Sequence, residues 1–158
     1  MGEHAEKLSV RQVIRDVVAE TAPEELPLLA GLEPLDDTAV DRVLGRRART
    51  REPLGFGLDT AVALVTPVLW TVLSDVARQE LQAAAGGLLA RLKRRLRRRR
   101  RPPQDQAGLT LSPLDHVQAE HVRELVLARC TAAGIDDARA AAIADGVTVR
   151  LLLGEPRP

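Results

Sequence analysis

The feature that most constrains the fold of this chain is a run of 15 uncharged residues, 60–74, that is followed by an arginine-rich run. In the second run, 91–101, nine of the eleven residues are basic. Apolar residues keep close to one helical face from Val68 to Leu96, which predicts a long central helix that changes from apolar to basic. The pair Gly86-Gly87 is the expected place for that helix to bend or break.

The uncharged run suggests a membrane span, but its length and neighbours oppose one. A spanning helix needs about 20 apolar residues to cross about 30 Å, whereas 15 residues reach only about 22 Å. Extension to residue 79 includes Asp75 and Arg78, each of which costs about 2.5–3.5 kcal/mol near the bilayer centre. The eight large aliphatic residues of the extended run return only about 0.3–0.6 kcal/mol each. Basic residues on both flanks also oppose a single pass, so simple spanning is the least favoured interpretation.

Composition favours an all-α fold. Phe56 and Trp70 are the only aromatic residues, so Leu, Val and Ala must form the core, and these residues suit packing between helices. We predict a small helical bundle with a long central apolar-to-basic helix and a C-terminal αα-hairpin. Its expected regions are an N-terminal helical region (1–55), the central helix (56–101), a linker (102–111) and the hairpin (112–158).

The first helix has the clearest pattern. Ser9 and Gln12 have the spacing of a capping box, and Pro23 ends the segment. The apolar residues then recur at helical spacing: Val10, Val13, Ile14, Val17 and Val18.

Three further helix starts and stops follow. A short helix is expected over 24–30 with a stop at Gly31, and Asp36 or Asp37 is expected to cap a third helix. At Pro67 two readings stay open. Either Pro67 kinks one helix, or Thr66 caps a new helix with Pro67 at its first position.

The last third predicts a helical hairpin without any convincing strand. Ser112, Pro113 and Asp115 form the start signal, Gly134 ends the first helix, and Asp136 caps the second. The expected buried stripe of the first helix is Leu114, Val117, Val122, Leu125, Val126 and Cys130. That of the second is Ala140, Ile143, Ala144, Val147 and Leu151.

Charge is strongly segregated along the chain, although the formal net charge is only +1. Residues 1–55 carry 8 basic and 11 acidic side chains, and residues 102–158 carry 5 basic and 8 acidic ones. Residues 56–101 carry 10 basic and 3 acidic ones. The basic middle indicates either an anionic partner or attraction between the thirds of the same chain.

No residue pattern indicates catalysis, a cofactor or a metal. His116 and His121 are five apart, which places them on different helical faces rather than at the i, i+4 spacing of a helical zinc site. Cys130 lies on an apolar stripe and is expected to be a buried small hydrophobe. The chain contains no nucleophile elbow, phosphate-binding loop or CxxC pair. We therefore predict a non-enzymatic protein with no cofactor.

The favoured functional interpretation is an accessory protein whose 60–101 segment contacts an anionic membrane surface, as in a membrane-active effector. Its acidic flanking thirds would mask the basic helix until release. The predicted contacts with the anionic surface are Arg91, Lys93, Arg94, Arg95, Arg97, Arg98, Arg99, Arg100 and Arg101. The predicted apolar, interfacial contacts are Leu64, Val68, Leu69, Trp70 and Leu73.

Two alternatives stay open. In the first, 60–90 is the core helix of a soluble adaptor or of a subunit in a multiprotein assembly, and a partner protein or a second copy completes its surface. In the second, the arginine run binds nucleic acid non-specifically, although the hairpin is acidic and no aromatic residues interleave the arginines. The charged N-terminus does not resemble a signal peptide, so we expect a cytoplasmic protein, peripheral to the membrane if it binds one.

Overall fold

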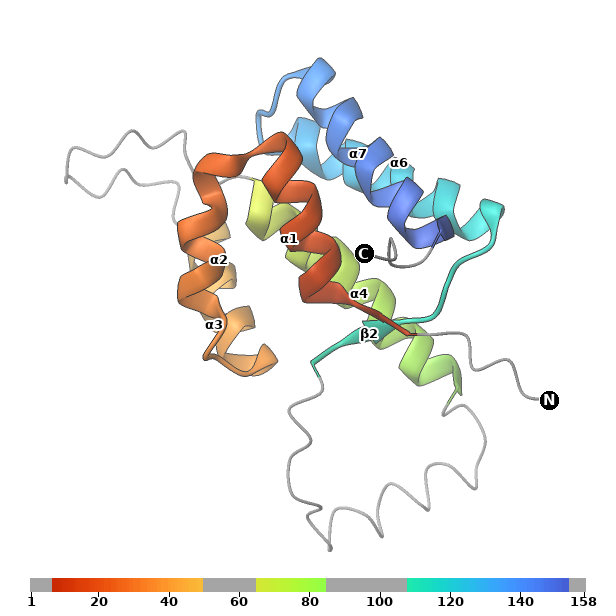
Figure 1. Ribbon diagram of the computed structural model, residues 1–158, viewed down its shortest axis with the longest axis horizontal. Coiled ribbons are helices and arrows are strands. Elements are labelled where there is room, and N and C mark those ends of the chain that lie inside the picture. The colour runs from red at the N-terminus through yellow and green to blue at the C-terminus, as the bar shows by residue number, and fades with distance from the viewer. Residues whose placement is uncertain (1–6, 50–64, 85–107, 154–158) are drawn as a thin grey trace, which may run out of the picture.

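The computed structural model describes residues 7–49, 65–84 and 108–153, without the side chains of residues 46–49. Helices dominate, which confirms the predicted all-α class and the C-terminal hairpin (Figure 1). The elements are β1 (Leu8–Ser9), α1 (Val10–Thr21), the 3₁₀ turn η1 (Pro23–Glu25), α2 (Leu26–Leu32), α3 (Asp37–Arg49), α4 (Val65–Ala84), β2 (Thr110–Leu111), α6 (His116–Ala132) and α7 (Asp137–Leu153).

Helix α1 forms as its sequence predicts. The Ser9 hydroxyl accepts a hydrogen bond from the Gln12 backbone N–H at 3.4 Å. The reciprocal half of the expected capping box does not form, and the Gln12 NH₂ group donates to Asp16 Oδ1 at 2.8 Å. All five residues of the predicted stripe are buried. One face of α1 therefore supplies the core.

The next two helices differ slightly from expectation. The short helix begins with the 3₁₀ turn at Pro23–Glu25 and continues through Gly31 to Leu32. The backbone N–H of Ala39 donates to Asp36 Oδ1 at 2.7 Å, so Asp36 rather than Asp37 caps α3.

Helix α4 starts at Val65, and its start is held by a residue from far away in the sequence. The carboxylate of Glu25 accepts hydrogen bonds from the backbone N–H groups of Val65 (3.0 Å) and Thr66 (2.7 Å). Thr66 therefore lies inside the helix and is not its cap, which corrects the expected start. Pro67 falls in the first turn, where its missing N–H needs no partner. The predicted break at Gly86-Gly87 lies outside the described residues.

Two short strands tie the chain together where none was predicted. Leu8 pairs with Leu111 and Ser9 with Thr110 in an antiparallel register. The Val10 N–H adds a bond to the carbonyl of Leu109 at 3.0 Å. The end of the predicted linker (102–111) thus joins the fold, and Leu111 is fully buried.

In the hairpin, the stripe of α7 is buried as predicted, but the stripe of α6 is partly wrong. Asp115 and Gln118 form a full capping box at the start of α6, and Gly134 follows its end with a φ of +83°. The buried face of α6 contains Ala119, Val122, Val126 and Cys130. Val117 and Leu125 are instead exposed, at 81% and 37% of their surface. Leu114, before the helix, is half-buried.

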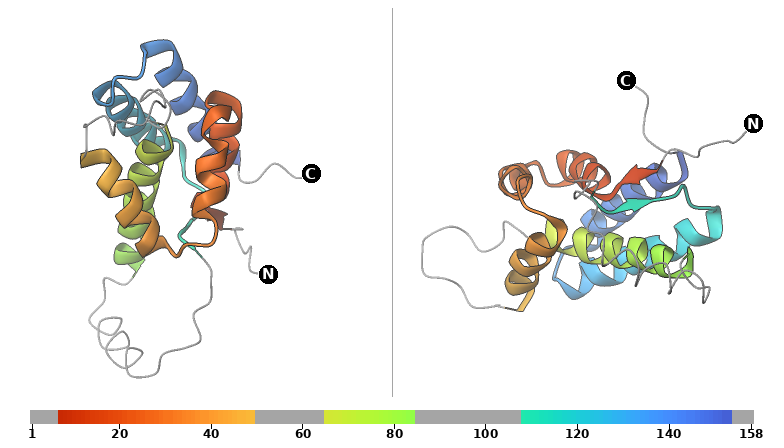
Figure 2. Two further views of the ribbon diagram at one scale, coloured as in Figure 1. Left: turned by 90° about the vertical axis from the view of Figure 1, so that its left-hand side faces the viewer. Right: turned by 90° about the horizontal axis from the view of Figure 1, so that it is seen from below.

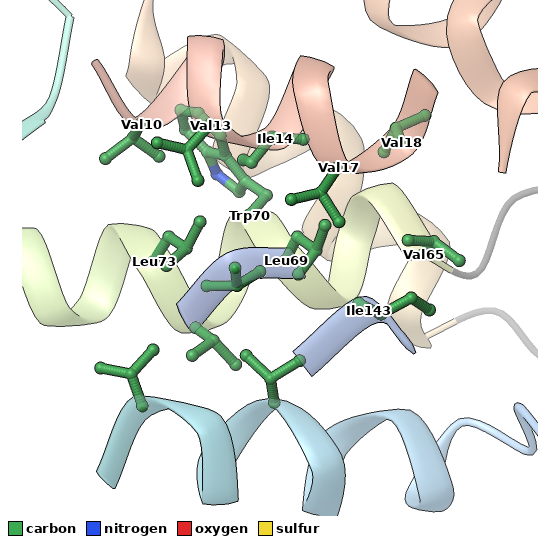
Figure 3. Packing of buried hydrophobic residues seen from close by; sticks show 14 of the residues in the cluster. Val10, Val13, Ile14, Val17, Val18, Val65, Leu69, Trp70, Leu73 and Ile143 are labelled. Atoms are coloured by element: carbon green, nitrogen blue, oxygen red, sulfur yellow. The ribbon is translucent and has the colours of Figure 1, made fainter. Parts of the chain in front are cut away.

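The core lies around α4, which runs between α1 on one side and the hairpin on the other (Figures 1 and 2). Val13, Ile14 and Val17 of α1 point toward Leu69 of α4 (Figure 3). One hydrophobic cluster includes side chains from β1, β2 and all six described α-helices. The central helix is therefore a core element from Val65 to Ala77, and its last turn, 81–84, is exposed.

Candidate functional site

The predicted anionic-surface contacts lie in a segment that the structure does not describe. Arg91 to Arg101 fall between the last described residue of α4, Ala84, and Gly108, where the described chain resumes. The last turn of α4 and the start of β2 lie at the same end of the bundle (Figures 1 and 2). The described residues before and after the basic segment, up to Ala84 and from Gly108, therefore lie at one end of the fold.

Three of the five predicted interfacial contacts lie in the core instead of on a surface. Leu69 and Leu73 are fully buried, and Trp70 is 4% exposed. Val68 is half-buried, and Leu64 lies outside the described residues. Sequence periodicity placed Val68, Leu69 and Leu73 on one face, but it could not show that α1, α3 and the hairpin pack around α4. In this fold Leu69, Trp70 and Leu73 are covered by other parts of the protein.

Trp70 lies in a cluster of polar partners. Its indole Nε1 donates to Asp41 Oδ1 at 2.8 Å, and the other oxygen of Asp41 accepts from Arg78. The guanidinium carbon of Arg11 lies 5.7 Å from the centroid of the Trp70 ring, within the range of a cation–π interaction. The only tryptophan of the chain is thus packed, hydrogen-bonded and covered.

Arg11 and Asp37 anchor the chain where it returns from the basic segment. Arg11 donates to the carbonyls of Leu32 (3.0 Å) and Leu35 (2.7 Å) and to Asp37 Oδ1 (2.8 Å). The other oxygen of Asp37 accepts from the backbone N–H of Leu109 at 2.8 Å. The return point of the chain is therefore held by a charged, hydrogen-bonded node.

Gly108 lies beside this node of Arg11 and Asp37. A Cβ at this position would lie 3.5 Å from Asp37 Oδ1 and 3.7 Å from Arg11 Nε, which is ordinary contact distance. A second tie lies further along, where the Ser112 N–H donates to the carboxylate of Glu80 on α4 at 3.1 Å. These contacts fix the flank after the basic segment without requiring glycine for space.

A small pocket lies where α1, α2, α3 and α4 meet. Its volume is about 40 Å³, and it is partly open to solvent. The side chains that line it are Arg11, Ile14, Arg15, Leu29, Leu32, Glu33, Val40, Leu44, Thr66 and Trp70. Half of these ten residues are both buried and apolar: Ile14, Leu32, Val40, Leu44 and Trp70. The pocket was not predictable from sequence because four separate elements build it.

The described residues show no cluster suited to metal binding. Within the described ranges, no group of three His, Cys, Asp or Glu side chains could hold a metal ion. His116 and His121 are both exposed. Burial raises the pKa of the Cys130 thiol to about 11, which disfavours the reactive thiolate.

Comparisons with protein-family models, with curated proteins and with solved structures each find no significant match to this chain. Among the helices that the structure describes, none combines the length and the apolar character needed to cross a bilayer. Function is therefore inferred from the residues and their geometry.

Proposed function

We propose that this chain is a non-enzymatic helical accessory protein that contacts an anionic membrane surface through its basic segment, 91–101. The observation that carries the proposal is the concentration of nine basic residues within eleven positions. Each cation near an anionic surface contributes about 1 kcal/mol. The ties at Asp37 and Glu80 support the proposal because they fix the chain on the return side of the segment to the bundle.

The contact is electrostatic in this proposal. Leu69, Trp70 and Leu73 are needed for the core, so their insertion into a membrane would dismantle the packing between α1 and α4. The bundle stays folded at the membrane and presents the basic segment from one end. Such binding weakens with salt, because screening shortens the range of the attraction to about 8 Å at physiological ionic strength.

Vesicle flotation tests the proposal. The full chain is expected to float with vesicles that contain a third phosphatidylglycerol at low salt, and to be released by 0.5 M NaCl. It is not expected to float with phosphatidylcholine vesicles. A variant with all nine basic residues of 91–101 changed to Gln should lose flotation, whereas a matched variant with the eight arginines changed to Lys should keep it. Failure of the unmodified protein to float with either vesicle at low salt would contradict the proposal.

The emission of Trp70 tests whether the bundle stays intact. Because the ring is buried beside Arg11 and bonded to Asp41, its emission is expected to be blue-shifted in buffer and unchanged by anionic vesicles. A change in emission on vesicle binding would show that α4 leaves the core, and would support the insertion that the sequence first suggested.

The second candidate is a helical adaptor or a subunit of a larger assembly. The burial of Leu69, Trp70 and Leu73 favours it, because the apolar part of the central segment serves the fold. Under this candidate the protein ignores vesicles, and the basic segment is a solvated charge run. Non-specific binding of nucleic acid is the third outcome, recognised by a gel shift that disappears at physiological salt.

A further inference from the structure

Helix α6 has a second stripe of residues besides the one that it buries against α4 and α7. The buried side contains Ala119, Val122, Val126 and Cys130. A different set, which we call the outer stripe, recurs at alternating spacings of three and four residues and is exposed throughout: Gln118, His121, Leu125, Ala128 and Ala132. This alternation is the heptad period, in which residues of one helix meet the same side of a second helix.

The outer stripe has the composition of a helix contact. Leu125 is its largest apolar side chain, and 37% of its surface is exposed. Ala128 and Ala132 follow on the next turns, and side chains this small let a second helix approach closely. No member of the outer stripe is an acidic or basic residue of the Asp, Glu, Lys or Arg kind. The stripe can therefore be covered without burying such a charge.

The two edges of the outer stripe have opposite charges. A helix turns by about 100° per residue, so Glu124 lies on one edge and Arg129 on the other. Both side chains are exposed, and neither forms an ion pair within the described part of the chain. The neighbouring Arg123 is bound instead to Asp145 at 2.8 Å, with Glu120 at 3.6 Å.

Glu124 and Arg129 do not pair with each other in one helix. Residues of the same helix meet at spacings of three and four, whereas these two are five apart and on opposite edges. In a parallel pair of helices, however, a residue on one edge meets the residue five positions later on the facing edge of the second helix. Ion pairs at these edge positions decide which helices pair and in which direction.

We propose that the outer stripe of α6 is the contact surface for a second copy of this chain, with the two α6 helices parallel about a two-fold axis. The axis brings Glu124 of each copy opposite Arg129 of the other. Both ion pairs form at once, because a two-fold contact uses the same residues twice. Leu125 packs against Leu125 of the second copy, and Ala128 against Ala128.

Charge favours the parallel direction over the antiparallel one. In an antiparallel pair like edges meet, so Arg129 faces the edge that carries Arg129 of the second copy and gains no partner. A second copy of α6 supplies the matching charges and the matching small residues together. This self-complementarity is the reason for choosing a second copy as the occupant of the surface.

The contact is weak in this proposal. It uses one face of a helix of about four turns, so the buried area lies at the low end for protein pairs. We expect a Kd between about 10 and 500 µM, which leaves the chain monomeric at low micromolar concentration. The inference does not depend on the proposed membrane contact, because it uses none of the residues of 91–101.

Sedimentation equilibrium between about 5 and 500 µM, without vesicles, measures the pairing. The mass of the unmodified chain is expected to rise from that of a monomer toward that of a dimer. Glu124→Arg and Arg129→Glu should each weaken the pairing about tenfold, because each variant opposes like charges at both pairs. The double variant restores opposite charges with their positions exchanged, so it should recover most of the lost affinity.

Glu120→Arg is the matched control. It makes the same change of charge as Glu124→Arg, one turn earlier on α6 and away from the outer stripe, at a side chain that is 59% exposed. It should change the Kd by less than about twofold. This control separates an effect of the edge residue from an effect of net charge.

Disulfide formation tests the direction of the pair. Cys130→Ala removes the only native cysteine, and Gln118→Cys or Ala132→Cys then places one thiol near either end of the outer stripe. In a parallel pair each residue meets its own copy, within reach of a disulfide. Both variants should therefore form linked dimers under oxidised glutathione at 200 µM, well above the background given by Glu120→Cys.

Three results would overturn the proposal. A constant monomer mass up to 500 µM would show that a second copy does not cover this surface. A double charge variant as weak as the two single variants would show that Glu124 and Arg129 do not meet. Linked dimers that form only when the Gln118→Cys and Ala132→Cys chains are mixed would show an antiparallel pair.

Discussion

The thiol of Cys130 shows how far burial changes the chemistry of one residue. Burial raises its pKa from 9.0 to about 11, so at pH 8 only about 0.1% of it is thiolate, the form that reacts. We expect native protein to react with a disulfide reagent at pH 8 at least about 100-fold more slowly than protein in guanidinium chloride. Absorbance of the released thiolate measures both rates, and native and denatured rates within a few-fold of each other would contradict the prediction.

The same shift predicts how stability depends on pH. Because the folded pKa is raised, the folded state holds the thiol proton more tightly than the unfolded chain does. The protonated thiol's contribution to the free energy of unfolding is fully present below pH 9.0. It is lost as the pH rises through about 11. The free energy of unfolding is measured against pH for the unmodified chain and for a Cys130→Ala control. The control should lack this part of the loss of stability at alkaline pH.

The bond between Trp70 and Asp41 gives a further prediction at this scale. Asp41→Ala removes the acceptor of the buried indole N–H and one partner of Arg78, so it should lower the free energy of unfolding by about 1–3 kcal/mol. Asp75→Ala is the control, because Asp75 is exposed and its pair with Arg78 spans 4.0 Å; it should change stability by less than about 0.5 kcal/mol.

Urea unfolding followed by circular dichroism measures both changes. A Trp70→Phe variant completes a double-mutant cycle. If the indole bond contributes, Asp41→Ala should cost less in the Trp70→Phe background than in the unmodified chain. Equal costs in the two backgrounds would show that the bond contributes nothing.

At the scale of elements, sequence predicted α1 and α7 better than α6. In α1 the large apolar residues fall on one face, so periodicity alone identifies the buried side. In α6 apolar residues occur on several sides, including Val117, Leu125 and Leu127, and the contacts with α4 and α7 decide which side is buried. The small Ala119 occupies part of that side. Periodicity gives little weight to a single alanine, so the predicted stripe was partly wrong.

Contacts between residues far apart in the chain limit how much of the site could be predicted from the sequence. Glu25 holds the start of α4 across 40 residues, and Asp41 meets Trp70 across 29. The pocket combines four elements. No local pattern encodes such pairings, so sequence predicted the helices and the burial of Cys130 but neither the pocket nor the partners of Trp70.

The buried face of α6 gives a prediction at the scale of elements. Val126→Ala removes two methyl groups from a fully buried position and should cost roughly 2 kcal/mol. Val117→Ala makes the same chemical change on the same helix at a position that is 81% exposed, and should stay within about 0.5 kcal/mol of the parent. Thermal unfolding of the two variants measures the difference. Similar costs at the two positions would restore the stripe that the sequence first indicated, because that stripe included both valines.

At the scale of the whole molecule, the two ends of the described chain are joined. The strand at Leu8–Ser9 pairs with the strand at Thr110–Leu111, and Arg150 of α7 reaches Glu20 of α1 at 2.6 Å. Arg139 of α7 donates to the carbonyl of Thr21 at 3.1 Å. A single hydrophobic cluster runs through both halves. The hairpin is therefore part of the bundle core, and its α7 covers α1.

This arrangement predicts one cooperative unfolding transition. Trp70 reports on the packing of α1, α3 and α4, while Cys130 reports on the hairpin. In urea, the change in Trp70 emission and the gain in Cys130 reactivity should have the same midpoint, because loss of the hairpin uncovers the face of α1 that Val17 shares with Gly146 of α7. Arg150→Gln removes the ion pair with Glu20 and should lower both midpoints together. If the thiol becomes reactive at a urea concentration where the indole emission is still native, the hairpin unfolds independently, and the bundle is two units rather than one.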